Sequence, residues 1–265
     1  MLADLAGSPS QPHAFSERPP GAAADWTVPQ HWERFTAEEH RVWDVLFARQ
    51  QERLAGRVVR AFAEGLDLLR LDRPGIPMLT ELNARLEARS GWTVVAVPGL
   101  LPDDIFFGHL AARRFPAGNF IRRGDQLDYL QEPDVFHDVF GHVPMLADLA
   151  TADFMQRLGE IGLAAGRAGR SAEMARLYWY TVEFGLALED GAPRIYGAGI
   201  ASSFGETAHA LDGPAARRTP FDLDRVLSTP YRSDAMQPLY FVADDLPALM
   251  RALARSDMGA LLATA

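Results

Sequence analysis

The chain has 265 residues, of which 48% are hydrophobic, so it is long enough to bury a sizeable core in one large domain or two small ones. A formal net charge of −9 argues against a nucleic-acid partner, and no run of about 18 apolar residues indicates a membrane span. The absence of cysteine excludes disulfides and thiolate metal ligands, and without a signal-peptide pattern we expect a cytoplasmic protein with no membrane partner.

The N-terminal part of the chain changes in composition near residue 25. Residues 1–25 are rich in Pro, Gly and Ser and predict a disordered tail, whereas residues 26–265 predict a single domain. A helix is predicted to begin after Thr36, because Glu39 stands at the capping-box position. Apolar residues then recur at helical spacing and predict one long stripe, formed by Val42, Leu46, Leu54, Val58, Phe62 and Leu66.

Shorter elements are predicted through the middle of the chain. Phe106 and Phe107 are adjacent on a predicted helix and cannot share a face, so one is expected in the core while the other lines a cavity, although both could be core residues. The predicted elements are a helix at Met78–Arg89 that stops before Gly91, a buried strand at Thr93–Val97, a helix within Leu100–Arg114 and a strand-like stretch at Phe115–Asp128.

The C-terminal half is predicted to be mostly helical. Helices are expected at Ala152–Gly166, Ala172–Leu188 and Asp245–Arg255, with a short helix opening at Ser202–Phe204 and a strand at Gln237–Val242. The fold class is therefore predicted to be mainly α with a few short β-strands (α+β), in one domain.

Two histidines, His137 and His142, lie five residues apart within the apolar stretch Pro133–Pro144. On a regular helix their side chains would point about 140° apart. A π-bulge would bring them to the same side, and Gly141 and Pro144 are residue types that favour such a distortion. We therefore hypothesise that both imidazoles converge on one metal ion, although a histidine pair at this spacing is more often without a metal.

A third ligand is predicted downstream. Glu183 is the only acid in the apolar segment Tyr178–Leu186, and a buried carboxylate requires a cation, a metal or a proton. Two histidines and one carboxylate form the facial triad of non-heme iron(II) oxygenases, which leaves coordination positions open. The same set also suits catalytic zinc, so a zinc hydrolase is an alternative, although its H-E-x-x-H spacing is absent. A non-catalytic binding or scaffold protein is a third interpretation.

Three blocks of sequence carry a resemblance to a known family. They read H-D-V-F-G-H-V-P from His137, Y-W-Y-T-V-E-F-G-L from Tyr178 and Y-G-A-G-I-A-S-S-F-G-E from Tyr196. They resemble the signature blocks of the pterin-dependent aromatic amino acid hydroxylases, most closely the bacterial members that act on phenylalanine. The resemblance runs from about Trp26 to about Leu253. It implies an iron-dependent catalytic domain that hydroxylates L-phenylalanine to L-tyrosine with O2 and tetrahydrobiopterin or a related tetrahydropterin.

The resemblance also implies roles for single residues. His137, His142 and Glu183 would hold Fe(II). Trp179 and Phe184 would line the pocket for the substrate ring, although simple core packing is the alternative for both. On the substrate side, Arg122, supported by Asp134, would bind the substrate carboxylate, and Ser202 would form a hydrogen bond with a ligand histidine. The residues implied at the pterin are Gly99, Leu101, Phe106, Asp138 and Tyr178.

Some features remain open at this point. The family's usual Thr-Pro before the iron helix is replaced by Leu130-Gln131, which leaves the contact to the substrate ammonium uncertain. Tryptophan or tyrosine hydroxylation stays an alternative, because the loop at Tyr231–Gln237, where the family distinguishes ring substituents, does not reveal a preference. The end of the chain at Met258–Ala265 shows no heptad pattern, so we expect a monomer.

Overall fold

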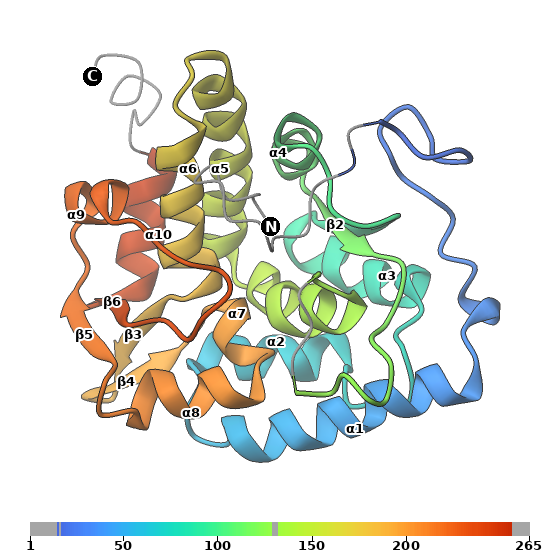
Figure 1. The fold of residues 1–265 in the computed structure, drawn as a ribbon, viewed down its shortest axis with the longest axis horizontal. Coiled ribbons are helices and arrows are strands. Elements are labelled where there is room, and N and C mark those ends of the chain that lie inside the picture. The colour runs from blue at the N-terminus through green and yellow to red at the C-terminus, as the bar shows by residue number, and fades with distance from the viewer. Residues whose placement is uncertain (1–14, 16, 129–131, 256–265) are drawn as a thin grey trace.

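The computed structural model describes residues 15, 17–128 and 132–255. Helices predominate and strands are short (Figure 1). The α-helices are α1 (Ala37–Leu54), α2 (Arg60–Leu69), α3 (Leu79–Ser90), α4 (Asp103–Ala111), α5 (Leu149–Arg167), α6 (Ser171–Tyr178), α7 (Ala198–Ala201), α8 (Phe204–Asp212), α9 (Leu223–Ser228) and α10 (Leu246–Arg255). Shorter helical segments are the 3₁₀ turns η1 (Trp32–Arg34) and η3 (Val143–Ala147), and the π-helices η2 (Phe136–His142) and η4 (Trp179–Glu183).

The strands form two small sheets at different places in the fold. Strands β1 (Thr93–Val97) and β2 (Arg114–Gly118) pair in parallel, with α4 connecting them. The second sheet has the order β4-β3-β6-β5 and combines one antiparallel hairpin with parallel pairs. Its strands are β3 (Leu186–Glu189), β4 (Ala192–Ile195), β5 (Arg217–Pro220) and β6 (Leu239–Ala243). The predicted α+β class is confirmed.

Two predicted helices are wrong in their extent. The apolar stripe from Val42 to Leu66 is divided between α1 and α2, because the chain turns at Gly56, whose φ of +67° is left-handed. The helix predicted to reach Leu188 ends at Glu183, and Leu186–Glu189 is the strand β3. A short apolar run cannot be assigned to helix or strand from periodicity alone, and here pairing with β4 and β6 decides.

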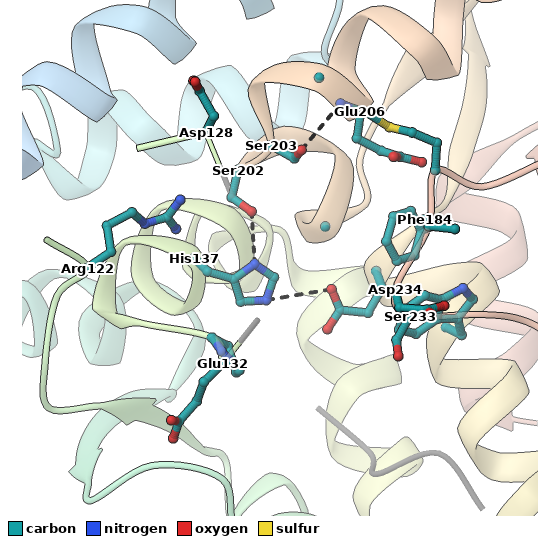
Figure 2. A pocket seen from close by; sticks show the side chains of 17 residues that line it. Arg122, Asp128, Glu132, His137, Phe184, Ser202, Ser203, Glu206, Ser233 and Asp234 are labelled. Carbon is teal, nitrogen blue, oxygen red and sulfur yellow. Dashed lines mark hydrogen bonds and ion pairs between the residues drawn. The ribbon is translucent and has the colours of Figure 1, made fainter. Parts of the chain in front are cut away.

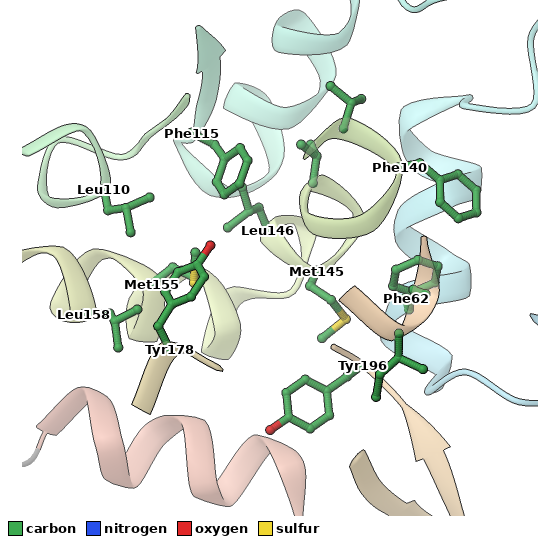
Figure 3. Packing of buried hydrophobic residues seen from close by; sticks show 14 of the residues in the cluster. Phe62, Leu110, Phe115, Phe140, Met145, Leu146, Met155, Leu158, Tyr178 and Tyr196 are labelled. Carbon is green, nitrogen blue, oxygen red and sulfur yellow. The ribbon is translucent and has the colours of Figure 1, made fainter. Parts of the chain in front are cut away.

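The π-helix η2 lies at the centre of the molecule and carries part of the core. In Figure 1 it is the yellow-green helix between α2 and β2. Phe140 stacks on Phe136 with a centroid distance of 4.7 Å and meets the edges of Phe47 and Phe62 at 5.5 and 6.1 Å. Figure 3 shows Phe140 beside Phe62 on one side of this core. The aromatic packing holds η2 rigidly, so the histidines on its other face have fixed positions.

Helices α4 and α5 approach each other closely because two glycines of α5, Gly159 and Gly162, face α4. A Cβ on Gly162 would lie 2.4 Å from the ring of Phe107, and one on Gly159 would lie 2.3 Å from the backbone nitrogen of Ala111. Phe107 is therefore a core residue. Phe106 is also buried in the core and borders a cavity described below, so each of the two interpretations of this pair holds in part.

We expect Gly162→Ala to destabilise the protein by about 1–3 kcal/mol, because the added methyl group overpacks the contact with Phe107. Gly166→Ala is the matched control on the same helix, since a Cβ there meets nothing closer than 4.0 Å and alanine favours helix. Urea unfolding of both variants measures the difference. Equal stability of the two variants would contradict the close packing of α4 on α5.

Part of the predicted N-terminal tail is among the described residues. Asp25 forms an ion pair of 2.8 Å with Arg114 on β2, and a hydrogen bond from Thr27 helps to lower the pKa of Asp25 to about 2. Residues 1–14 and 16 of the predicted tail lie outside the described residues, as do Leu130-Gln131 and Met258–Ala265. Within the described part of the chain, no helix is both long and apolar enough to cross a bilayer.

Candidate metal centre and active site

The predicted π-distortion at the histidine pair is confirmed, because Phe136–His142 is a π-helix. Widening the helix by one residue per turn brings residues i and i+5 to one side. The Nε2 atoms of His137 and His142 lie 3.2 Å apart, and the two rings meet edge to face. The rings therefore converge, as the hypothesis of a shared metal ion requires.

Glu183 completes the group from a second π-helix, η4, which the sequence did not predict. Its Oε1 lies 3.3 Å from Nε2 of His142, and its Oε2 lies 3.7 Å from Nε2 of His137. Ligands bound at right angles to one ion at metal–ligand distances near 2.1 Å would be about 3.0 Å apart. The three side chains thus stand at separations suited to one face of a coordination sphere, with each ligand atom on a buried or nearly buried side chain.

The electrostatics of the three side chains favour a cation between them. Burial opposes ionisation of Glu183, but the neighbouring His142 and His137 hold its pKa well below the usual range. Burial also opposes charge on His137, yet the nearby carboxylates of Glu183, Asp138 and Asp134 together raise the pKa of His137, whereas burial lowers the pKa of His142. Oε1 of Glu183 has no hydrogen-bond partner among the described residues. An ionised buried oxygen without a donor beside two imidazole nitrogens fits a metal ion with N and O ligands.

Ser202 determines which nitrogen of His137 faces the other ligands. The Ser202 hydroxyl donates to the carbonyl oxygen of Ala198 at 2.8 Å, so it accepts from Nδ1–H of His137, also at 2.8 Å (Figure 2). In the neutral ring, which is the form that binds a metal, Nε2 of His137 is then the lone-pair nitrogen, and it points toward Glu183. The predicted hydrogen bond between Ser202 and a ligand histidine is present in the structure.

We expect Ser202→Ala to weaken Fe(II) binding by about 10–100-fold, because Nδ1–H of His137 loses its acceptor and the ring loses its fixed tautomer. Anaerobic calorimetry of Fe(II) binding measures the change. Ser203→Ala is the control, since Ser203 caps α8 through the backbone nitrogen of Glu206 and does not contact His137. Wild-type affinity in Ser202→Ala would show that the hydroxyl does not orient the ligand.

Arg122 and Asp134 form a buried ion pair beside the histidines. Nε and Nη2 of Arg122 donate to the two carboxylate oxygens of Asp134 at 2.8 and 2.9 Å. The backbone nitrogens of Arg122 and His137 donate to the same carboxylate, at 2.9 and 3.0 Å. Burial opposes ionisation of Asp134, but the Arg122 guanidinium and the two backbone donors together lower the pKa of Asp134. The predicted partnership is present, and Nη1 of Arg122 takes no part in it.

A cavity of about 370 Å³ lies on one side of the three metal-ligand candidates. Figure 2 shows Arg122 on one wall and Phe184, Ser233 and Asp234 on the opposite wall, with His137 between them. Trp179 and Phe184 both line it, with ring centroids 4.5 Å apart, so they are wall residues rather than core packing alone. The cavity also includes Ser233, Asp234, Ala235 and Met236 from the loop that the family resemblance connects with substrate choice. Gly199, Ser203 and Glu206 line it as well, and no site role was predicted for them.

A second, smaller cavity lies on the other side of the candidate metal ligands. His137 and Glu183 line both cavities, and His142 lines the smaller one. The residues predicted to bind pterin are all brought together at this cavity, namely Gly99, Leu101, Phe106, Asp138 and Tyr178. Its volume of about 20 Å³ suits a single water molecule, so a pterin ring enters only if part of this wall moves.

Two side chains of the smaller cavity are already engaged. Asp138 is buried rather than solvated, and its Oδ2 accepts a hydrogen bond of 2.8 Å from the backbone nitrogen of Gly118, while burial raises its pKa. Phe106 meets Tyr178 edge to face, with ring centroids 5.6 Å apart. The Asp138 carboxylate therefore has a direct backbone partner in addition to any ligand in the cavity.

Comparison with known proteins identifies the family. The sequence model of the biopterin-dependent aromatic amino acid hydroxylases matches residues 27–256. The chain belongs to this family. It is 56% identical over 243 residues to phenylalanine-4-hydroxylase of Caulobacter vibrioides, which covers 92% of this chain and 82% of that protein. It is 50% identical to phenylalanine-4-hydroxylase of Ralstonia nicotianae, over 86% of this chain and 73% of that protein.

Solved structures of family members have the same fold. Phenylalanine hydroxylase of Chromobacterium violaceum bound to cobalt superposes with a TM-score of 0.87 at 47% identity, covering 92% of this chain and 89% of that chain. A second structure of that enzyme, with bound iron(III) and 7,8-dihydrobiopterin, has a TM-score of 0.86 at 48% identity, covering 91% and 86%. Membership of this hydroxylase family favours the hydroxylase interpretation of the site over the zinc-hydrolase and scaffold interpretations.

Proposed function

We propose that the protein is a phenylalanine 4-monooxygenase, which converts L-phenylalanine to L-tyrosine with O2 and a tetrahydropterin at Fe(II). The observation that carries this proposal is the position of the candidate metal ligands between two cavities, with His137 and Glu183 bordering both. One cavity has an arginine and an aromatic wall, as an aromatic amino acid requires, and the other brings together the residues expected at a pterin. The names of the bacterial relatives support the choice of phenylalanine.

We assign the binding of iron to His137, His142 and Glu183. When bound there with a reduced pterin, the metal supplies the activation of O2 that hydroxylation of an aromatic ring needs. The contribution of the protein is to hold the ligands in one protonation state. Ser202 keeps the proton of His137 on Nδ1, and the low pKa of Glu183 keeps its carboxylate ionised. Glu183 is itself buried, which strengthens its electrostatic interaction with the neighbouring imidazoles.

The larger cavity is proposed to hold phenylalanine by its two ends. The guanidinium of Arg122, kept in place by Asp134, is the group suited to the substrate carboxylate. Trp179 and Phe184 form the wall suited to the aromatic ring. Fixing both ends would present the ring to the metal side of the cavity in one orientation, which is how an active site raises a reaction rate by positioning. Gly99, Leu101, Phe106, Asp138 and Tyr178 are proposed to bind the pterin.

The proposal is tested by anaerobic reconstitution with Fe(II), followed by exposure to O2 with phenylalanine, tyrosine and tryptophan in parallel, with and without reduced pterin. We expect tyrosine from phenylalanine, with a requirement for both Fe(II) and the pterin. If tryptophan or tyrosine were turned over faster than phenylalanine, that amino acid would be assigned as the substrate instead. Absence of pterin-dependent O2 uptake with each amino acid would overturn the proposal.

We also propose that the protein acts as a cytoplasmic monomer without nucleic-acid or membrane partners. The complete lack of cysteine is consistent with a reducing compartment, and the net charge of −9 is unfavourable for binding nucleic acid. Elution from a sizing column at the volume of a 29.2 kDa protein is the expected result, and elution at the volume of a dimer or tetramer would contradict it.

A further inference from the structure

Gln237 is a buried residue behind the wall of the larger cavity, at the junction between the loop 231–237 and β6. It does not itself line the cavity, and only 2% of its surface is exposed. Its side-chain Oε1 accepts a hydrogen bond of 3.0 Å from the indole Nε1 of Trp179. Its Nε2 donates to the carbonyl oxygens of Arg232 and Ala235, at 2.8 and 2.9 Å. The amide therefore joins η4 to the loop, using both of its N–H donors.

The groups held by Gln237 form the aromatic end of the cavity. Trp179 lies between two other rings, Tyr231 at a centroid distance of 4.2 Å and an angle of 14°, and Phe184 at 4.5 Å. Four loop residues, Ser233, Asp234, Ala235 and Met236, line the same cavity. The rotation of the indole and the path of the loop are thus both set by hydrogen bonds to one side chain.

The position of Gln237 is itself fixed from a different element, α8. Its backbone nitrogen donates to Oε1 of Glu206 at 3.1 Å, and the hydroxyl of Tyr240 donates to the same oxygen. Its carbonyl oxygen is 3.0 Å from Nε2 of His209. Because these contacts do not involve the loop or Trp179, Gln237 is anchored independently of the parts that it holds.

We infer that Gln237 is a positioning residue for the substrate ring, which sets the size of the aromatic end of the cavity and thereby the choice among aromatic amino acids. The inference rests on the proposed function, and it adds a residue that touches neither the substrate nor the metal. A side chain of any apolar type would fill the space behind Trp179. An amide is required to satisfy the indole N–H and two loop carbonyls at once, which fixes both walls in one arrangement.

The first test compares Gln237→Met with Gln156→Met. Methionine is similar in length and makes none of the three hydrogen bonds. Gln156 is the control because its amide also connects two elements, accepting from Arg113 at 2.7 Å, but lies outside the cavity. With Gln237→Met we expect kcat/KM for phenylalanine to fall by about 10–100-fold through misplacement of the ring. We also expect a loss of preference for phenylalanine over tryptophan, and less tyrosine formed per pterin oxidised.

The substrate preference and the coupling ratio distinguish positioning from a purely structural role. Loss of stability alone reduces the amount of active protein and leaves both ratios unchanged, and this is the result expected of Gln156→Met. If folded Gln237→Met kept the wild-type preference and coupling, the inference would be overturned. If wild-type protein hydroxylated none of the aromatic amino acids, the proposed function would fail and this inference with it.

A second test approaches the same hydrogen bond from Trp179. Trp179→Phe removes the indole N–H, and Trp92→Phe is the control because that indole donates to the carbonyl oxygen of Ala152 away from the cavity. Because the two residues act through one contact, the loss of preference in Gln237→Met/Trp179→Phe should be smaller than the product of the two single losses. Fully multiplicative losses would contradict the coupling. Gln237→Leu, which likewise fills the space and makes none of the three hydrogen bonds, carries the test if Gln237→Met fails to fold.

Discussion

Replacing Glu183 with alanine is expected to abolish stoichiometric Fe(II) binding and to lower tyrosine formation by about 10³-fold or more. Loss of a residue that only orients a metal ligand lowers metal affinity or activity by about 10–100-fold, and a larger loss is expected here because Glu183 is proposed to be a ligand itself. The alanine variant also leaves His137 and His142 facing each other at 3.2 Å without the carboxylate that stabilises positive charge there. Fe(II) content after anaerobic loading, together with product analysis, measures both effects.

Two further variants define the cause of that loss. Glu183→Gln keeps the shape of the side chain and removes its charge, so we expect it to bind Fe(II) far more weakly than wild type. Glu173→Gln on α6 is the control, because Glu173 is a partly buried glutamate that pairs with Arg170 at 3.0 Å, outside both cavities. Full Fe(II) content and activity in Glu183→Gln would show that the carboxylate is not a metal ligand.

Asp134→Asn is expected to be the most destabilising conservative substitution near the site, at about 3–5 kcal/mol. Asp134 is completely buried, and its carboxylate accepts hydrogen bonds from Arg122 and from the backbone nitrogen of His137. In the asparagine variant the side-chain NH2 group faces N–H donors of Arg122 or His137, and the charge of Arg122 stays buried without its partner. Chemical denaturation measures the stability, and the KM for phenylalanine is expected to rise as Arg122 loses its fixed position.

The control for Asp134→Asn is close in sequence. Asp125 also forms a two-point ion pair, with Arg123 at 3.0 and 2.9 Å, but both side chains are exposed to solvent. Asp125→Asn should leave stability and KM unchanged, since exposed pairs are screened by water. If the two variants had equal stability, burial of the Arg122 pair would not be the source of its effect.

The metal-ligand candidates were accessible from sequence because their signal is local. The interval between His137 and His142 suits a π-helix and not an α-helix, and Glu183 is the only acid in its apolar segment. The pairing of Arg122 with Asp134 was suggested by the family resemblance, and the structure shows both residues buried together. Residue type and spacing pointed to the three metal-ligand candidates, whereas the choice of Arg122 over Arg123 needed the family resemblance.

Other features depend on contacts between distant parts of the chain and could not be predicted. Leu186–Glu189 is a strand because it pairs with β4 and β6, and its own apolar residues fit a helix equally well. The resemblance pointed to the loop at Tyr231–Gln237 as a whole, but it did not single out Gln237, whose hydrogen bond comes from Trp179, 58 residues earlier in the chain. The small volume of the smaller cavity likewise follows from packing, and no residue pattern encodes it.

The most direct test of the account is a crystal structure of the protein loaded with Fe(II) under anaerobic conditions. The account predicts one ion bound to Nε2 of His137, Nε2 of His142 and a carboxylate oxygen of Glu183, at metal–ligand distances of about 2.0–2.2 Å. An ion bound by other residues, or a loaded protein in which Glu183 remains out of bonding distance, would contradict the central claim.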